Sequence, residues 1–292
     1  MSSLRIAIRW TFSLLLLWSG QTSSYGQDLD SLLAVPSDES VWPVINGFKG
    51  SKIGSGQSTS LPGNGELRLF VGHRFGKING GFYEFFGLDQ ATMRLGFDYG
   101  FTDWLAAGFG RSTMEKTWDL YVKASPIQQF PGKSPVTATF HAASSVNTLR
   151  NVYPYENDGL GDRLSVALQG LVSRSYRKFS IQVAPVYLHN FYDLRSGGPT
   201  HFFSTGVAAR LRLTRFLDLT AEYYALIVKP SYNVTDPFTL GVDIETGGHL
   251  FQLVLTNAQG MFEKGFLTNT NGRWTEGDIY FGFNLIRTFY MK

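Results

Sequence analysis

Segments of about ten residues that alternate between apolar and polar or glycine positions recur along most of this chain. In residues 91–101, ATMRLGFDYGF, every odd-numbered position is apolar and every even-numbered position is polar or glycine. The same alternation occurs in residues 117–125, 135–143, 162–173, 203–213 and 217–226. A period of two predicts β-strands. Because each strand has a full apolar face opposite a face with ionisable residues, the pattern indicates lipid on one side and water on the other rather than the core of a soluble sandwich.

The composition agrees with a β-rich protein that is only partly surrounded by water. Charged residues make up 17% of the chain and 32 of its 292 residues are glycine, whereas soluble domains average about 25% charged and about 7% glycine. The chain has no cysteine, which excludes disulfides, thiolate metal sites and thiol enzymes. Aromatic residues at 15% argue against disorder.

Residues 1–26 have the three parts of a secretory signal peptide: two arginines, an apolar stretch centred on residues 14–18, and a small, polar end. Ser24 and Gly26 provide the small side chains that precede a cleavage site, so Gln27 is the predicted new N-terminus. The apolar stretch is shorter than the ~20 residues of a spanning helix, which argues against a membrane anchor. We expect export to the cell outer membrane, with residues 27–43 as a periplasmic N-terminal arm.

Residues 44–292 are predicted to form the barrel. No apolar run after residue 26 is long enough for a spanning helix, and a closed β-barrel is the other structure that satisfies all backbone hydrogen bonds in lipid. The predicted fold is all-β: a transmembrane antiparallel up-and-down β-barrel of about 12 strands, with 10–14 compatible with the pattern. The links alternate between short and mostly long, with long ones at residues 75–90, 144–161, 191–200 and 229–246.

Two stretches do not follow the alternation. Residues 259–276 lie where a short turn is expected, unless residues 261–269 form a poorly patterned strand, which the count of twelve assumes. Residues 41–53 are either a further strand or a segment that fills the lumen.

Ionisable residues on the inward faces are the candidate lining of the lumen. They are Arg94, Asp98, Asp119, Lys123, Arg163, Arg210, Arg212, Asp218 and Glu222. Mixed charges on an inner wall either line a wet channel or pair across it and close it. Strand 104–110 points Ala106, Gly108 and Gly110 inward, which leaves room for a pore or for a plug formed by residues 27–60.

The link 75–90 is unusually aromatic. It contains Phe75, Phe82, Tyr83, Phe85 and Phe86. These side chains either fold into the lumen as a constriction or belong to an aromatic girdle at the lipid headgroups.

The sequence has no motif for catalysis, metal binding or nucleotide binding. None of the five histidines belongs to an HExxH pattern, and no GxSxG elbow, GxGxxG loop or P-loop is present. Removal of Arg5 and Arg9 with the signal leaves 24 basic against 23 acidic residues, so no nucleic-acid partner is expected. We expect no cofactor, no metal and no enzymatic activity.

The last strand, within residues 279–289, has an aromatic-rich outer face. Phe281, Gly282, Phe283, Leu285 and Phe289 resemble the C-terminal assembly signal that the barrel-insertion machinery reads in bacterial outer-membrane barrels. The chain departs from that signal because it ends on Lys292 rather than on an aromatic residue.

Several longer motifs resemble an uncharacterised family of Gram-negative outer-membrane β-barrels, a domain of unknown function. They are GHRFG (72–76), FGLD (86–89), RLGFDYGFTDWLAAGFGRS (94–112), LFQLVLTNAQG (250–260) and FGFN (281–284). The resemblance covers the chain from about residue 44 to the end. It implies the fold and the outer-membrane location, but no reaction, ligand or partner.

Three functional hypotheses follow. The first is a small, porin-like diffusion channel for small solutes in contact with outer-membrane lipid. The second is a closed structural or docking barrel for envelope proteins, with the acidic residues Asp28, Asp30, Asp38 and Glu39 of the arm as the contact surface. The third and least favoured is a barrel lipid hydrolase that uses His141.

Overall fold

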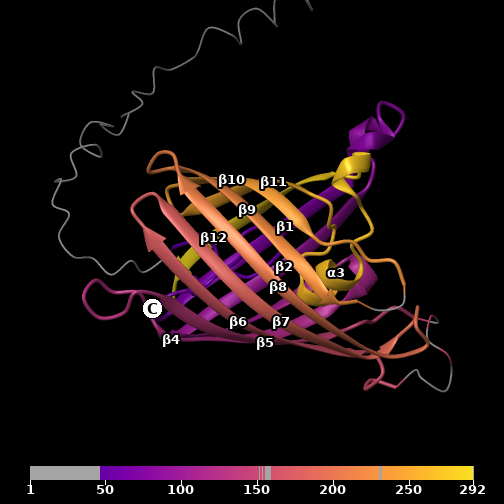
Figure 1. Ribbon diagram of the computed structural model, residues 1–292, viewed down its shortest axis with the longest axis horizontal. Coiled ribbons are helices and arrows are strands. Elements are labelled where there is room, and N and C mark those ends of the chain that lie inside the picture. The colour runs from indigo at the N-terminus through magenta and orange to yellow at the C-terminus, as the bar shows by residue number, and fades with distance from the viewer. Residues whose placement is uncertain (1–46, 151, 153, 155–158, 230–231, 292) are drawn as a thin grey trace, which may run out of the picture. The chain divides into compact units, whose positions relative to one another are not determined.

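The computed structural model describes residues 47–150, 152, 154, 159–229 and 232–291. Twelve antiparallel strands, each paired with its sequence neighbours, form a barrel that closes where β1 pairs with β12 (Figure 1). The strands are β1 (Glu66–Lys77), β2 (Ala91–Thr102), β3 (Leu105–Ser112), β4 (Trp118–Ile127), β5 (Thr137–Val146), β6 (Leu164–Tyr176), β7 (Phe179–Asp193), β8 (Gly198–Arg212), β9 (Leu217–Val228), β10 (Phe238–Thr246), β11 (His249–Thr256) and β12 (Tyr280–Tyr290). The predicted antiparallel barrel of about twelve strands is confirmed.

The predicted count of twelve contains two errors that leave the total unchanged: one predicted strand does not form, and one strand was not predicted. Residues 261–269 do not form a strand, because they contain the helix α3 (Glu263–Thr268), all six residues of which are buried. Strand β10 instead lies in the predicted long link 229–246. Its sequence FTLGVDIET does alternate, with Thr239 and Asp243 buried, but the strand is only nine residues long. The predicted link 191–200 also shortens to residues 194–197, because β7 and β8 extend into it.

The two ends of the barrel differ in the length of their connections. At one end the links are short, such as 103–104, 177–178 and 247–248. Gly247 and Gly248 both have positive φ, 47° and 93°, in their two-residue turn, a backbone conformation that favours glycine. The other end carries longer loops, including 78–90 and 257–279. In bacterial outer-membrane barrels the short turns are periplasmic and the long loops are extracellular, so we call these the turn end and the loop end.

Each strand divides its side chains between the lumen and the outside. In β6, Ser165, Ala167, Gln169, Leu171 and Ser173 are buried, whereas Leu168 and Val172 between them are about half exposed. Large exposed apolar residues recur on the outer face of the other strands. A soluble monomer rarely exposes so continuous an apolar surface, which fits a wall that faces lipid.

Two segments outside the strands are buried inside the barrel. Residues 47–62, which we call the N-terminal insert, are buried except for the half-buried Lys49. Residues 257–270, which we call the loop insert, are buried except for two half-buried positions, and they include α3 (Figure 1). The described part of the predicted 41–53 segment is therefore lumen filling and not a strand.

The predicted signal peptide, residues 1–26, and the arm, residues 27–43, lie outside the described residues. Within the described part of the chain, no helix has both the length and the apolar character needed to cross a membrane.

Candidate functional site

The candidate functional site is the lumen with its two inserts. The N-terminal insert makes a tight turn in which Ser58 N–H donates to Ser51 O at 3.0 Å and Ile53 N–H donates to Gly56 O at 3.1 Å. A Cβ atom on Gly56 would lie 1.9 Å from the hydroxyl oxygen of Tyr224 on β9. Glycine is required there because the insert backbone approaches the wall too closely for any side chain.

Strands from two parts of the barrel wall, β9 and the adjacent pair β12 and β1, hold the tip of this turn. From β9, the Glu222 carboxylate accepts the backbone N–H of Ser55 at 2.6 Å and that of Gly56 at 3.2 Å. Arg74 on β1 and Asn284 on β12 each donate to Gly54 O at 3.0 Å. Hydrogen bonds to charged groups contribute about 1.5–3 kcal/mol each, so the contacts fix the tip between β9 and the β12–β1 part of the wall.

Lys123 on β4 connects the two arms of the same turn. Its ammonium donates to Ser51 O at 2.9 Å and to Ser58 O at 3.0 Å. The side chain is buried, and an ammonium group is stable in such a place only when its donors are satisfied. Lys123 therefore attaches both arms of the N-terminal insert to β4.

At the turn end, ionic contacts attach the base of the insert. Lys49 lies 3.4 Å from Asp218 and 3.0 Å from Glu245. Asp218 also pairs with Arg210 at 2.6 Å, and Arg210 donates to Gly47 O. Acidic and basic wall residues thus pair with each other and with the insert.

The loop insert closes the other half of the lumen with apolar side chains. Phe266 and Leu267 of α3 are completely buried in a cluster with Leu188, Phe202 and Leu226 from the barrel wall. Burial of side chains of this size stabilises by roughly 1.5–3 kcal/mol each. This half of the lumen is packed like the core of a soluble domain.

The two inserts meet at Glu263. Its carboxylate accepts Gln57 Nε2 from the N-terminal insert at 2.9 Å and Gln169 Nε2 from β6 at 3.2 Å, and His141 Nε2 lies 3.9 Å away. Burial alone would raise the pKa of Glu263, but His141, Lys52 and the hydrogen bond from Gln57 outweigh it and hold the pKa at about 2. Glu263 is therefore an ionised group inside the barrel.

The remaining inward charges are also paired. Arg94 on β2 forms a bidentate contact with Asp119 on β4, and Tyr121 donates to Asp98. Arg94 and Asp119 are both nearly inaccessible. Both contacts link β2 to β4 across the intervening strand β3 on the inner face of the wall.

The structure places seven of the nine candidate lining residues on the buried inner face. They are Arg94, Asp98, Asp119, Lys123, Arg210, Asp218 and Glu222. Arg163 is half-buried at the loop-end rim, where it donates to Asn147 O at 3.2 Å. Arg212 is exposed at the turn end because β8 extends beyond the lumen there. The buried residues contact each other or the inserts rather than an open water path.

The aromatic link 75–90 does not narrow the lumen. Phe82 and Tyr83 are 81% and 93% exposed, Phe85 and Phe86 are each 53% exposed, and the loop projects beyond the strands at the loop end (Figure 1). Phe75 lies on the outer face and stacks on Phe281 at 5.7 Å. The constriction interpretation is therefore wrong for the exposed four, and the lumen is blocked by the inserts instead.

The final strand divides as its alternation predicts. Phe281, Phe283, Leu285 and Phe289 face outward, whereas Gly282 faces inward against Arg74. A Cβ on Gly282 would lie 2.6 Å from Arg74 Cδ, so this glycine makes room for the arginine that holds the insert.

Sequence reasoning did not identify Arg74 or Glu263 as part of this site, and it named His141 only as a candidate for lipid hydrolysis. Arg74 lies within the alternating run of β1, and its inward parity is the signal that could have found it. Glu263 had only one signal, the failure of alternation in residues 259–276. Among the described residues, no group of three or more His, Asp or Glu side chains is arranged to hold a metal ion.

Comparison with known proteins places this barrel in a family. The family model described as "Membrane bound beta barrel domain (DUF5777)" matches residues 48–289. The chain belongs to this family. The match begins within the N-terminal insert, so the membrane-bound barrel domain includes most of that insert as well as the strands.

Similar solved structures include three barrels with low identity. The NanC porin has 9% identity and a TM-score of 0.48, over 77% of this chain and 98% of that chain. The translocator domain of the autotransporter NalP from Neisseria meningitidis has 12% identity and a TM-score of 0.38, over 78% and 88%. LpxR from Salmonella typhimurium has 13% identity and a TM-score of 0.36, over 77% and 99%. A comparison with curated proteins gives no match.

Proposed function

We propose that this membrane-bound barrel resides in the outer membrane and acts as a closed docking element for envelope proteins rather than as an open diffusion channel. The observation that carries the proposal is the filled lumen. One insert closes the turn-end half with hydrogen bonds and ion pairs, and the other closes the loop-end half with Phe266 and Leu267. The predicted signal peptide and the aromatic final strand support the outer-membrane location.

In this proposal, the residues that contact envelope proteins lie outside the lumen. Residues 27–43 precede the N-terminal insert and carry four acidic side chains. An exported chain that is attached to the membrane by its barrel would present this arm to periplasmic proteins, and the insert would hold the arm at the barrel.

A small-solute channel that opens by release of the N-terminal insert is the second candidate. It is favoured by the chemistry of that insert, whose contacts with Lys123, Glu222 and Arg74 use backbone groups that water can also satisfy. The apolar loop insert would still have to move before a solute could pass.

Single-channel recording in planar bilayers distinguishes the two. For a docking barrel, the wild type is silent, deletion of residues 47–62 alone gives little current, and replacement of residues 257–270 in addition gives stable conductance. Discrete steps from the wild type would contradict the closed state.

Photo-cross-linkers at positions 28, 30 and 38 test docking in cells. Failure of every position to form a protein adduct would contradict docking.

Lipid hydrolysis has little support from the site. His141 is about 1% exposed, lies inside the wall, and has its nearest acidic group, Glu263, at 3.9 Å. A triad needs a nucleophile in hydrogen-bond reach of the histidine, and neither ring nitrogen of His141 has a hydrogen-bond partner among the described residues. Phospholipid turnover that disappears in His141→Ala, with the barrel still folded, would overturn this conclusion.

A further inference from the structure

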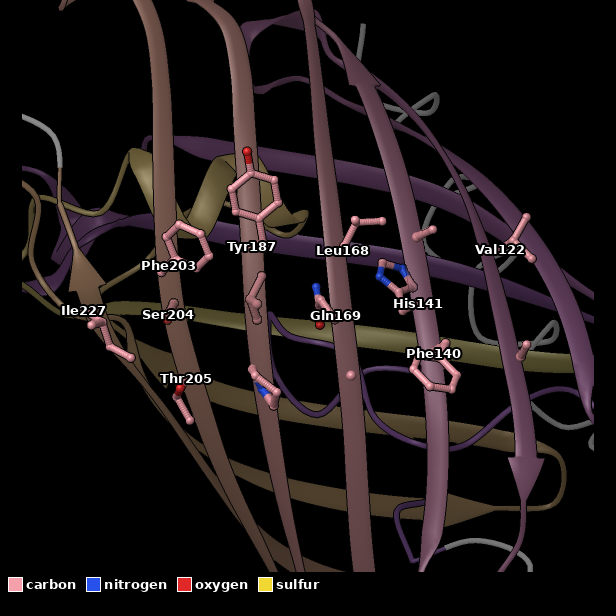
Figure 2. A pocket seen from close by; sticks show the side chains of 15 residues that line it. Val122, Phe140, His141, Leu168, Gln169, Tyr187, Phe203, Ser204, Thr205 and Ile227 are labelled. Carbon is pink, nitrogen blue, oxygen red and sulfur yellow. The ribbon is translucent and has the colours of Figure 1, made fainter.

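A groove crosses the outer surface of the wall from β4 to β9 and has a volume of about 740 Å³ (Figure 2). Its sides are large apolar residues that point away from the lumen, including Phe140 and Ile227, which are 65% and 68% exposed. Its floor contains small residues from five adjacent strands, Ala124, Ala142, Gly170, Pro185 and Thr205. In the strand register the larger Phe140 lies between Ala124 and Gly170. No Asp, Glu, Lys or Arg lines the groove.

Gly170 keeps the groove open, although nothing else in the described chain requires a glycine there. A Cβ atom on Gly170 would meet only Pro185 Cγ, at the ordinary contact distance of 3.8 Å. By contrast, Cβ atoms on the inward-facing Gly108 and Gly206 would lie 2.4 Å and 2.5 Å from tyrosine rings. Glycine within a strand is destabilising and often marks a place where a ligand approaches closely. Apart from Pro185, no described residue of the barrel therefore packs into the space above Gly170.

Pro185 opposite Gly170 adds to this depression. Proline has no N–H to donate to the ladder, and the pairs recorded between β6 and β7 stop at Gln169–Val186 and resume at Val172–Val183. The lipid-facing surface of the wall is therefore low at Gly170 and Pro185, because neither residue has a large side chain. Larger side chains flank the groove on both sides.

The loop-end side of the groove leads to a polar cluster that also faces outward. Tyr187 and Phe203 line the groove and are register partners, and the next outward pair along β7 and β8 is His189 and His201. The two histidine rings stack at 4.5 Å, and Tyr187 Oη lies 2.8 Å from His201 Nδ1. Two residues along a strand correspond to about 7 Å, so imidazole groups lie just above an apolar groove on a lipid-facing wall.

We propose that the groove is a binding site for one acyl chain of a glycerophospholipid, with the lipid phosphate at His189 and His201. The uncharged groove of large and small apolar residues fits a hydrocarbon chain, and imidazole N–H groups are donors for phosphate oxygens. A second copy of the barrel would fill the groove with apolar side chains but would bring no anionic group to the histidines. The proposal is independent of whether the lumen is open or closed.

Native mass spectrometry of the delipidated full-length barrel in detergent tests the site. The protein is titrated with dioleoyl phosphatidylglycerol and, separately, with dioleoylglycerol, which has the same chains without the phosphate. We expect one tightly held phosphatidylglycerol in the wild type and about tenfold weaker binding in Gly170→Leu, because the added side chain excludes about two methylenes. The matched control is Ala209→Leu, which adds similar bulk to the outer face of β8 outside the groove and leaves binding unchanged.

The histidines are tested with the double variant His189→Gln, His201→Gln. It weakens phosphatidylglycerol binding and leaves dioleoylglycerol binding unchanged; an equal loss for both lipids would overturn the phosphate contact. Equal binding by Gly170→Leu and Ala209→Leu would overturn the groove. Selective binding of lipid A, or a dimer that Gly170→Leu dissociates in the absence of lipid, would each overturn the glycerophospholipid as occupant. If Gly170→Leu fails to fold, Thr205→Leu fills the same groove from β8 and is judged by the same outcomes.

Discussion

Gln57 Nε2 donates a hydrogen bond to Glu263 Oε1 at 2.9 Å, and this contact joins the two segments that fill the barrel. Gln57 comes from the N-terminal insert, which is anchored at its base by Lys49 near the turn end. Glu263 belongs to the connection between β11 and β12 at the loop end. Because neither residue belongs to the wall, the two inserts are held to each other inside the barrel as well as to the strands around them.

Loss of the Glu263 charge should destabilise the barrel. In Glu263→Gln the buried Lys52 loses a nearby opposite charge, and removal of one member of a buried charged set costs about 3 kcal/mol. Urea unfolding in detergent measures the effect. Glu276→Gln, at a carboxylate that is 56% exposed, serves as the control and should change stability by less than about 0.5 kcal/mol.

The same carboxylate predicts a pH dependence. Its pKa is about 2 in the folded barrel against an ordinary value of 4.5. A lowered pKa gives stability that is complete above the unfolded value and is lost as pH falls through the folded value. We expect wild-type stability to fall between about pH 4.5 and pH 2, and the part due to Glu263 to be absent in Glu263→Gln. Parallel curves for the two proteins would contradict the assignment.

Lys123→Met should release the N-terminal insert. The change removes the ammonium donor from the carbonyls of Ser51 and Ser58. Ser51 O keeps the N–H of Ser58, so the expected cost of roughly 1–3 kcal/mol comes from the Ser58 carbonyl. Because the chain has no cysteine, Ser55→Cys gives a single reporter in the buried turn. Maleimide labelling of that cysteine should accelerate in Lys123→Met and stay slow in the control Val122→Met, which changes a lipid-facing residue of the same strand.

Gly56→Ala should displace the same turn by steric conflict. Its methyl group would lie 1.9 Å from Tyr224 Oη, and overpacking of this kind costs about 1–3 kcal/mol. Tyr224→Phe removes the closest atom and should restore part of the lost stability, as measured by the unfolding midpoint. Gly161→Ala is the control, because a Cβ there meets no atom within 4 Å. Additive effects of Gly56→Ala and Tyr224→Phe would argue against the contact.

Phe266→Ala should destabilise the apolar packing between the loop insert and the barrel wall. Truncation of a fully buried phenylalanine costs about 3–5 kcal/mol, so the temperature at which the barrel loses heat-modifiable migration should drop. Phe82→Ala removes an equally large side chain that is 81% exposed and should have almost no effect.

The strands were predictable because lipid outside and polar groups inside impose one period on every strand. Residues such as Arg94 and Asp119 could be placed on the inner face by parity alone. For residues 41–53, lumen filling was one of two alternatives, and the pattern could not choose between them, because a segment inside a polar lumen has no apolar periodicity. The loop insert was not predicted. Residues 47–62 are rich in glycine and serine, and their burial depends on partners such as Glu222 and Asn284 that lie far away in the sequence. The failure of alternation therefore marked both inserts, and lumen filling was among the predicted alternatives only for the N-terminal one.

The N-terminal insert has consequences for the order in which the barrel assembles. Gly54 is held by Asn284, which is 230 positions later in the chain, and Ser55 by Glu222, which is 167 positions later. The N-terminal insert thus precedes every strand in the chain, yet its binding site is complete only when β12 is in place. Contacts over such separations slow folding. We therefore expect the N-terminal insert to become fixed in the lumen late in assembly, when nearly all strands are present.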